Sequence, residues 1–387
     1  MQVVTDPVRR ETLLRLIKAS GLQALLAWYP EDLVMMTGTW PCLGMNLCLY
    51  PLEGDPLYYL SDLEPEDVSP PGFIIRRFAV DTEKWADLRS ALESDVRRLG
   101  LKAEEIGIAL DGGQHAATTF SGETPPFGAL ALTTILDGLR VRDATALFTA
   151  AGLRKTPREI ERIRRANTVA GVGLTVFHEV AQPGRTEAEI AALVEGAIQS
   201  YSGRDGCSLA RAWAQVQAGR NTFYGGTFSR SSAYRVAEGD LVLLELATCV
   251  DGYWSDLTRT SGAGKVGDRK LTLLKTVQDA QEAAIAAVRP GITHGEIDHI
   301  ARQWLEERGF GAGFRHNTGH QVGFRYHDRG PTLQKGSTAV LEAGMVITVE
   351  PGCYGAAFDG GARFEDNILV DSAGAIMLSP HHIRWQG

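Results

Sequence analysis

The sequence predicts an α+β protein with two domains. At 387 residues the chain is longer than one ordinary hydrophobic core supports. Its first part alternates short apolar runs with helical patterns, which is typical of a mixed α/β domain. From about residue 151 two helices follow one another, and helices then alternate with pairs of strands, which favours antiparallel sheet. We therefore predict a smaller α/β domain over residues 1–150 and an α+β domain over residues 151–387.

The elements of the first domain follow from apolar spacing and turn residues. Leu13 and Ile17 lie on one face of a helix predicted over residues 7–19, which ends near Gly21. Runs of apolar and aromatic residues predict strands, and Gly54-Asp55 predicts the turn of a hairpin. The further elements predicted here are strands at 22–29, 72–80 and 105–110, a hairpin at 45–60 and a helix at 82–99.

Capping signals mark the first helices of the second domain. Pro157 suits the first position of a long helix whose N-cap is Thr156 or Lys155. Thr186 and Glu189 form the T-x-x-E pattern of a capping box at the start of the next helix. The change from strand-rich to helical sequence places the domain boundary near residues 148–152. Two later helices are predicted at Arg269–Val288 and Thr293–Glu307.

Composition excludes several classes of protein. A formal net charge of −8 argues against a nucleic-acid partner or an anionic membrane. No apolar run approaches the roughly 18 to 20 residues that span a bilayer, and the N-terminus has no apolar signal-peptide core. Five cysteines are odd in number and show no CxxC spacing, so buried free thiols in a reducing compartment are expected. We therefore expect a cytoplasmic protein without nucleic-acid or membrane partners.

Glu245 is an anomaly within an apolar strand. Five of the six residues from Leu241 to Leu246 are apolar, and the sixth is this carboxylate. A two-residue turn at Asp251-Gly252 would set residue 245 opposite residue 258. Asp256 would then share the face of Glu245 as a diagonal neighbour, whereas a three-residue loop would put the two carboxylates on opposite faces.

Two further strand-like segments repeat this anomaly. Glu350 ends the apolar run from Met345 to Val349, and Glu365 and Asp366 lie between Phe364 and Ile368. Burying an unpaired carboxylate is costly, so such a group acquires a partner or a shifted pKa. For a single carboxylate, pairing with Arg259 or Arg363 is the simpler interpretation, whereas several grouped carboxylates require a cation.

Nearby histidines favour a bound metal cation over pairing of the carboxylates with arginine. The segment "HNTGHQVGFRYHDRGP" holds His316, His320 and His327 within twelve residues. Histidines and carboxylates together suit a divalent ion such as Mn, Co, Fe or Zn rather than a thiolate site. Four carboxylates exceed the needs of one ion, which favours a two-metal centre that activates a bridging water.

The ordered set of Glu245, Asp256, His320, Glu350 and Glu365 resembles the M24 metallopeptidase family of methionine aminopeptidase, aminopeptidase P and prolidase. "GYWSDLTRT" is similar to the G-Y-x-S-D-x-T-R-T of that family, and "HNTGHQVGFRYHD" resembles its H-x-x-G-H-x-x-G-x-x-x-H-[ED]. "VITVEPGCY" and "ARFEDNILV" match T-x-E-P-G-x-Y and R-x-E-D-x-x-L-V. "GLQALLAWYPEDLVMMTGTW" resembles the N-terminal domain of the creatinase, prolidase and aminopeptidase P branch. The resemblance implies a pita-bread catalytic domain after a creatinase-type N-terminal domain.

The resemblance also implies roles for individual residues. Asp256 and Glu365 would bridge two divalent ions, most simply Mn, with His320 and Glu350 completing one ligand set and Glu245 the other. Glu350 would also handle the proton of the bridging hydroxide as general base and acid. His327 would steady the substrate or the developing oxyanion, His316 would line the pocket, and Arg363 would hold a carboxylate of substrate or ligand. The implied activity is that of an Xaa-Pro dipeptidase or aminopeptidase.

Aromatic residues supply candidates for a proline-sized subsite. We single out Tyr224 and Phe324 as substrate-binding residues, with core packing as the alternative for each. In similar proteins the loop corresponding to "TGTWPCLGMN" reaches the active site of a neighbouring subunit. The resemblance therefore implies a homodimer in which Trp40 lines the pocket and a small peptide or other amide is the substrate.

Two departures from the family pattern keep alternatives open. The chain has Glu245 where the family has an Asp ligand, and Gly226 where relatives usually carry a His that binds the peptide carbonyl. One alternative is a metal-independent, creatinase-like or ectoine-hydrolase-like enzyme that cleaves C–N bonds of small molecules. The other alternative is a non-catalytic binding protein on the same fold.

Overall fold

The structure, a computed structural model, describes residues 6–40, 45–81, 85–111, 132, 134–226 and 230–380. Its contacts divide the chain into two compact units, Met1–Gly152 and Leu153–Gly387. Cys42 and the first residues of the helix predicted at 82–99 lie outside the described residues. Among the described helices, none is both long and apolar enough to cross a membrane.

The first unit is built on a mixed six-stranded sheet with the strand order β4-β3-β2-β1-β5-β6. The hairpin of β2 and β3 is antiparallel, as the turn at Gly54-Asp55 predicts, and β1 pairs in parallel with β5. The first helix begins at its N-cap Asp6 and ends at Gly21, whose positive φ of 69° only glycine adopts easily. The elements are α1 (Pro7–Ser20), β1 (Ala24–Ala27), α2 (Pro30–Thr37), β2 (Leu47–Pro51), β3 (Leu57–Ser61), η1 (Glu66–Val68), β4 (Ile74–Phe78), α3 (Ala86–Arg98), η2 (Ala103–Glu105), β5 (Ile106–Ile108), β6 (Arg142–Asp143) and α6 (Thr145–Leu153).

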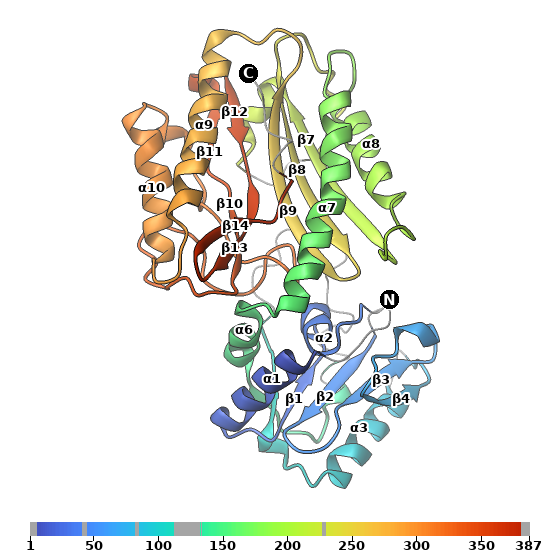
Figure 1. The fold of residues 1–387 in the computed structure, drawn as a ribbon. Coiled ribbons are helices and arrows are strands. Elements are labelled where there is room, and N and C mark those ends of the chain that lie inside the picture. Colours follow the sequence, from blue (N-terminus) through green and yellow to red (C-terminus); the bar gives the residue numbers. More distant parts are fainter. Residues whose placement is uncertain are drawn as a thin grey trace. The chain divides into compact units, whose positions relative to one another are not determined.

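The second unit opens with two capped helices that cover one face of an antiparallel sheet (Figure 1). The predicted capping box of Thr186 with Glu189 is present, and Thr156, one of the two predicted N-caps, forms a second box with Glu159. Phe177 and Val194 of these helices pack in one core with Leu244 of the sheet. The elements are α7 (Pro157–Val180), α8 (Glu187–Gln199), β7 (Ala210–Ala218), η3 (Gly219–Tyr224), β8 (Leu241–Val250) and β9 (Tyr253–Gly262).

A second core forms on the other side of this unit (Figure 1). Helices α9 (Asp268–Ala287) and α10 (His294–Glu307) pack there against the strands that carry Ile347 and Ile368. Both helices lie within two residues of their predicted bounds. The remaining elements are η4 (Gly311–Gly313), β10 (Val346–Val349), β11 (Gly352–Gly355), η5 (Ala356–Phe358), β12 (Gly360–Arg363), β13 (Asp366–Asp371) and β14 (Gly374–Met377).

The turn between β8 and β9 fixes the face on which the carboxylates lie. Asp251 and Gly252 have φ values of 50° and 87°, as a two-residue hairpin with the right strand twist requires. Glu245 is therefore opposite Thr258, and Asp256 is opposite Ala247. The predicted register is confirmed, and both carboxylates point away from the helices α7 and α8 because Leu244 and Leu246 occupy the opposite face.

Candidate metal centre

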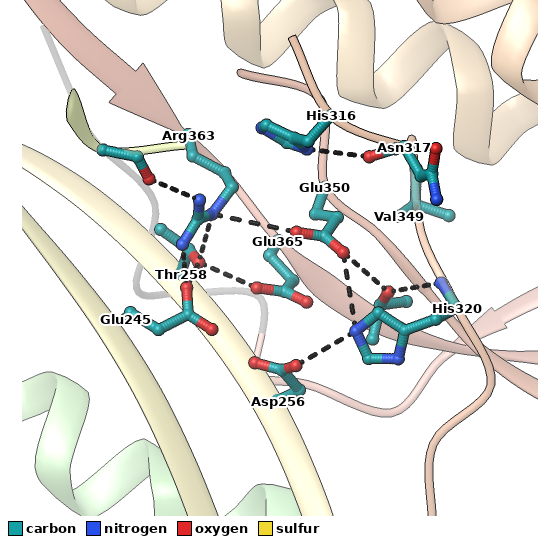
Figure 2. A network of polar contacts seen from close by, with 12 residues as sticks. Glu245, Asp256, Thr258, His316, Asn317, His320, Val349, Glu350, Arg363 and Glu365 are labelled. Atoms are coloured by element: carbon teal, nitrogen blue, oxygen red, sulfur yellow. Dashed lines mark hydrogen bonds and ion pairs between the residues drawn. The ribbon is translucent and has the colours of Figure 1, made fainter. Parts of the chain in front are cut away.

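Strands from both halves of the second unit bring the predicted ligands together (Figure 2). Glu245 and Asp256 come from the β8–β9 hairpin, Glu350 directly follows β10, and Glu365 lies between β12 and β13. His320 comes from the loop after η4 and points at Asp256 and Glu350. The hairpin therefore faces the strands of the second core, and these side chains gather between them (Figure 2).

Ligand atoms in the cluster are close enough to share cations. Three groups have one nitrogen or oxygen per residue within 4.8 Å of one another. Asp256, Glu365 and His320 each belong to two of these groups, and of these three the two carboxylates have the second oxygen that a bridging ligand needs. The groups are Asp256 with His320 and His327, His320 with Glu350 and Glu365, and Glu245 with Asp256 and Glu365.

Several of these atoms find no hydrogen-bond donor or acceptor among the described residues although they are buried. They are both carboxylate oxygens of Asp256, Nε2 of His320 and Oε1 of Glu365. His320 Nδ1 lies 2.9 Å from the carbonyl oxygen of Gln321, to which it donates a hydrogen bond, so the lone pair of Nε2 faces the site. That lone pair lies 3.2 Å from Asp256 Oδ2 and 3.5 Å from Glu350 Oε1. Acceptors facing acceptors at these distances fit a cation between them.

Burial makes the cluster costly to ionise without such a cation. Burial, together with the charge of Glu365, raises the pKa of Asp256, and burial with the charge of Glu350 raises the pKa of Glu365. Burial raises the pKa of Glu350 to about 8, although the Arg363 guanidinium opposes this effect. Burial also lowers the pKa of His320 to about 4, which keeps its imidazole neutral, as a metal ligand must be.

Glu245 differs from the other carboxylates because its oxygens already have donors. Tyr326 donates its hydroxyl to Oε1, while Thr258 and Arg363 donate to Oε2. Burial opposes ionisation of this carboxyl group, but the Arg363 charge and these hydrogen bonds outweigh it and hold the pKa of Glu245 at about 2. Arg363 therefore contacts the carboxylate of a predicted ligand, Glu245, and its Nε atom also lies 3.9 Å from Glu350 Oε2 (Figure 2).

The other arginine considered from the sequence pairs outside the cluster. Arg259 Nη2 donates to Asp366 Oδ1 at 2.6 Å, and both side chains are 1% exposed. Gln281 donates to the second oxygen of Asp366 at 3.0 Å. Asp366 is thus a structural carboxylate paired with the Arg259 guanidinium, whereas its neighbour Glu365 turns into the cluster.

His316 and Gly226 meet at one wall of the cluster. His316 Nε2 lies 2.9 Å from the hydroxyl of Tyr354, which in turn accepts a hydrogen bond from Arg363 at 3.0 Å. Burial lowers the pKa of His316 to about 3. A Cβ atom at Gly226 would lie 3.2 Å from Tyr354 and 3.3 Å from His316, so the missing side chain would have pointed into this wall.

His327 lies beside Asp256 and His320. Its Nε2 atom is 3.7 Å from Asp256 Oδ2, and its ring centroid is 3.7 Å from that of His320. Burial lowers the pKa of His327 well below its usual value. A neutral imidazole beside the ligands can donate one hydrogen bond to a bound substrate.

Phe324 and Tyr224, two predicted substrate residues of the second unit, have other surroundings than this cluster. Phe324 packs against Tyr253 at 5.8 Å between ring centroids and beneath the Lys155 ammonium. Tyr224 is 71% exposed and lines an open cavity instead. Trp40 belongs to the first unit. Their substrate-binding roles stay predictions.

Sequence reasoning did not assign roles to Thr258 and Tyr354, and it considered Tyr326 only as one of several aromatic residues that could shape the substrate subsite. All three contact the predicted residues directly. Tyr354 was visible as the last residue of the T-x-E-P-G-x-Y motif. Thr258 was visible as the residue opposite Glu245 in the hairpin. Tyr326 was visible as an aromatic residue near the predicted pocket, but nothing in the sequence indicated that its hydroxyl would donate to Glu245.

Comparisons with known proteins agree with this geometry. The profile of metallopeptidase family M24 matches residues 161–372. The chain is 35% identical to the Xaa-Pro dipeptidase of Pyrococcus furiosus over 225 residues, which are 58% of this chain and 62% of that protein. It is 33% identical to the "Probable dipeptidase PepE" of Mycobacterium tuberculosis over 311 residues, which are 77% of this chain and 80% of that protein.

Solved structures show the same fold. The prolidase of Pyrococcus horikoshii OT3 superimposes with a TM-score of 0.79 at 25% identity, covering 96% of this chain and 98% of that one. The sequence match to the P. furiosus dipeptidase covers only about three fifths of that relative's length. The predicted pita-bread fold is confirmed, and the chain belongs to metallopeptidase family M24.

Proposed function

We propose that this chain is a metal-dependent dipeptidase of the Xaa-Pro type with two divalent ions, most simply Mn(II). The observation that carries the proposal is the set of buried, unpaired donor atoms on Asp256, His320 and Glu365. Hard carboxylate oxygens with one imidazole suit Mn(II) better than a thiolate-preferring ion. The names of the relatives, Xaa-Pro dipeptidase and prolidase, support the substrate class.

The residues present fit two cation positions unequally. Asp256, His320, Glu350 and Glu365 offer atoms for one ion, and Glu245 with Asp256 and Glu365 offers atoms for a second. The first position has unpaired ligand atoms, whereas at the second Arg363 already neutralises Glu245. Bound divalent ions would supply Lewis acidity toward the peptide carbonyl and lower the pKa of an attacking water.

The chain's own groups would manage proton and charge around the scissile amide. Glu350, with a pKa of about 8 in the absence of a cation, is suited to take a proton from water and return it to the leaving amine. His327, neutral and beside Asp256, would donate a hydrogen bond to the developing oxyanion. Arg363 and Tyr354 would hold Glu245 and His316 in place.

A non-catalytic binding protein is the second candidate. The contact of Arg363 with Glu245 favours it, because an internal cation neutralises a predicted ligand without any metal. Gly226 points the same way, since no side chain is available at that position to hold a peptide carbonyl.

Peptide hydrolysis distinguishes these candidates. The chain is incubated with Mn(II), and release of proline from Ala-Pro is followed with and without EDTA. We expect Mn-dependent release that His320→Ala reduces at least about a hundredfold, because a metal ligand is lost. Arg289→Gln is the matched control, since Arg289 is exposed beyond the end of α9. Equal rates with and without metal would contradict the proposal.

Two finer features also remain proposals. The first is a cytoplasmic location, which rests on the cysteine usage. The second is a homodimer, in which Trp40 and its loop would complete the pocket of a partner subunit. Sedimentation would show the dimer, and Trp40→Ala would raise KM for Ala-Pro. A monomer whose kinetics are unchanged by Trp40→Ala would sink the dimer proposal.

A further inference from the structure

A polar cavity of about 870 Å³ opens beside η3 in the second unit. It is lined chiefly by charged and hydrogen-bonding side chains, among them Gln217, Arg220, Asn221, Arg230, Ser231 and Tyr234. This cavity is lined by none of the predicted ligands of the candidate metal centre. Its size accommodates an amino-acid side chain with its hydration.

Two arginines line this cavity, and both are exposed. Among the described residues, Arg220 and Arg230 form no ion pair. Nearby carboxylates are already engaged by backbone and wall groups. Glu187 accepts from Asn221 and from the backbone and hydroxyl of Ser232, and Asp240 accepts from Tyr234. The two guanidinium groups thus remain available to an anion from solution.

Gln215 and Gln217 connect this cavity to the metal centre. Both lie on the face of β7 that carries the site, and Gln215 is directly opposite Glu245. Each is 3% exposed. Neither amide atom of Gln215, nor Oε1 of Gln217, has a hydrogen-bond partner among the described residues. Buried amides left unpaired are costly, so a polar ligand atom that hydrogen-bonds to either residue would be favoured.

Gly225, which directly follows η3, also contacts both the cluster and the cavity wall. The carbonyl oxygen of Gly225 accepts a hydrogen bond from Arg363 at 2.8 Å, and a Cβ at Gly225 would lie 3.1 Å from Gln217 Oε1. The segment that ends η3 therefore touches the cluster through Arg363 and the cavity wall through Gln217.

We propose that this cavity binds the side-chain carboxylate of an acidic residue in a peptide substrate, and that the enzyme prefers acidic dipeptides. The inference rests on the proposed peptidase function and names its substrate class. Arg220 and Arg230 supply the charge, while Gln215 and Gln217 hydrogen-bond the polar atoms between the cavity and the scissile amide. Because both guanidinium residues are exposed, we expect discrimination of about fivefold rather than orders of magnitude.

Binding tests the cavity without reference to catalysis. Calorimetry compares glutarate with its uncharged diamide, glutaramide, on the Mn-incubated chain. We expect glutarate to bind about fivefold more tightly, and R220Q and R230Q each to abolish that ratio while R289Q keeps it. Equal affinity for the two probes, or an unchanged ratio in both R220Q and R230Q, would overturn the proposal.

Hydrolysis tests the preference itself. The matched pairs are Glu-Pro with Gln-Pro and Ala-Glu with Ala-Gln, which place the charge on the first or the second residue. We expect kcat/KM to favour the acidic member of one pair about fivefold, and R220Q to reduce that ratio toward one. Hydrolysis without any such preference overturns the inference alone. If none of the four dipeptides is hydrolysed but glutarate still binds selectively, the proposed peptidase function is overturned and the anion site is retained.

Discussion

Glu245 shows how a strand interior accommodates a charge. Its neighbours Leu244 and Leu246 pack into the core of the second unit, while its own side chain turns to the opposite face. There Arg363, Thr258 and Tyr326 donate to it. The extra methylene of Glu relative to Asp lets the carboxylate reach these donors, so the position combines a structural ion pair with a predicted ligand.

Replacing Arg363 should destabilise the folded chain, because Glu245 would be left buried without a charged partner. In Arg363→Met, the carboxylate of Glu245 stays buried and loses its charged partner. We expect the free energy of unfolding to fall by about 3 kcal/mol, as for other broken buried ion pairs. Urea unfolding followed by circular dichroism measures this change.

The double variant E245Q/R363M serves as its control. Both charges are then absent, so we expect the free energy of unfolding to recover part of the loss. If the free energy of unfolding of R363M alone lies within about 0.5 kcal/mol of that of the native chain, the ion pair contributes little to stability.

Glu350 gives the metal-free protein a distinctive pH dependence. Its pKa of about 8 in the folded chain exceeds the ordinary 4.5, so the folded state holds more protons than the unfolded state between these values. Stability must then fall as pH rises through this window. Between pH 7 and pH 8 we expect a loss of about 1 kcal/mol, measured by urea unfolding in EDTA.

Histidines oppose this trend only at lower pH. The pKa values of His316 and His320 are lowered to about 3 and about 4, so their contribution to stability is lost as pH falls below their ordinary 6.5. Glu350→Gln should flatten the slope above pH 7. A stability of the metal-free native chain that rises from pH 7 to pH 8 would contradict the pKa assigned to Glu350.

At the residue scale, sequence predicted which side chains gather but not how they pair. Glu245, Glu350 and Glu365 could be selected because they interrupt or end apolar runs, and Asp256 because the predicted turn sets it on the face of Glu245. His320 was selected from the clustering of three histidines and from the family resemblance. The donors of Glu245 could not be selected, since a Thr and a Tyr in such surroundings carry no comparable anomaly. Contacts of this kind depend on strand register and on loops that close from distant segments.

At the scale of elements, the β8–β9 hairpin decides the geometry of the site. The positive φ values at Asp251 and Gly252 produce a two-residue turn, and this turn sets both carboxylates on one face. Sequence could predict the register because Asp-Gly is a strong signal for this turn. It could not predict that Tyr224 ends an exposed η3 segment, because exposure of one aromatic residue leaves no periodic pattern.

The capping box of α7 can be tested alone. Thr156 accepts a hydrogen bond from the backbone of Glu159, whose side chain accepts from the Thr156 backbone at 2.8 Å. Thr156→Ala should lower the free energy of unfolding by about 1 kcal/mol. The matched control Thr168→Ala, in the middle of the same helix and exposed, should change it by less than about 0.5 kcal/mol in urea unfolding. Equal losses in both variants would contradict a capping role.

At the scale of the whole molecule, two cores within the second unit meet around the charged cluster. One core packs α7 and α8 on β7–β9, and the other packs α9 and α10 on β10–β14. The cluster takes residues from β8 and β9 on one side and from the segments after β10 and β12 on the other. A cation held there would join the two halves and stabilise the folded state preferentially.

Chelation should therefore lower thermal stability. A metal that binds only the folded state at a hundredfold excess over its Kd contributes about 2.7 kcal/mol. We expect the melting temperature of the Mn-loaded chain to fall by several degrees in excess EDTA, and to recover when Mn(II) is restored. Differential scanning fluorimetry measures both changes. In Asp256→Asn, which removes a shared ligand, EDTA should have little effect.

Metal content tests the central claim most directly. The chain is incubated with Mn(II), freed of excess ion and analysed by elemental mass spectrometry beside Asp256→Asn. We predict about two ions per native chain and a large loss in the variant, because Asp256 belongs to two of the three ligand groups. A native chain that retains no more metal than Asp256→Asn would contradict the assignment of this cluster as a metal centre.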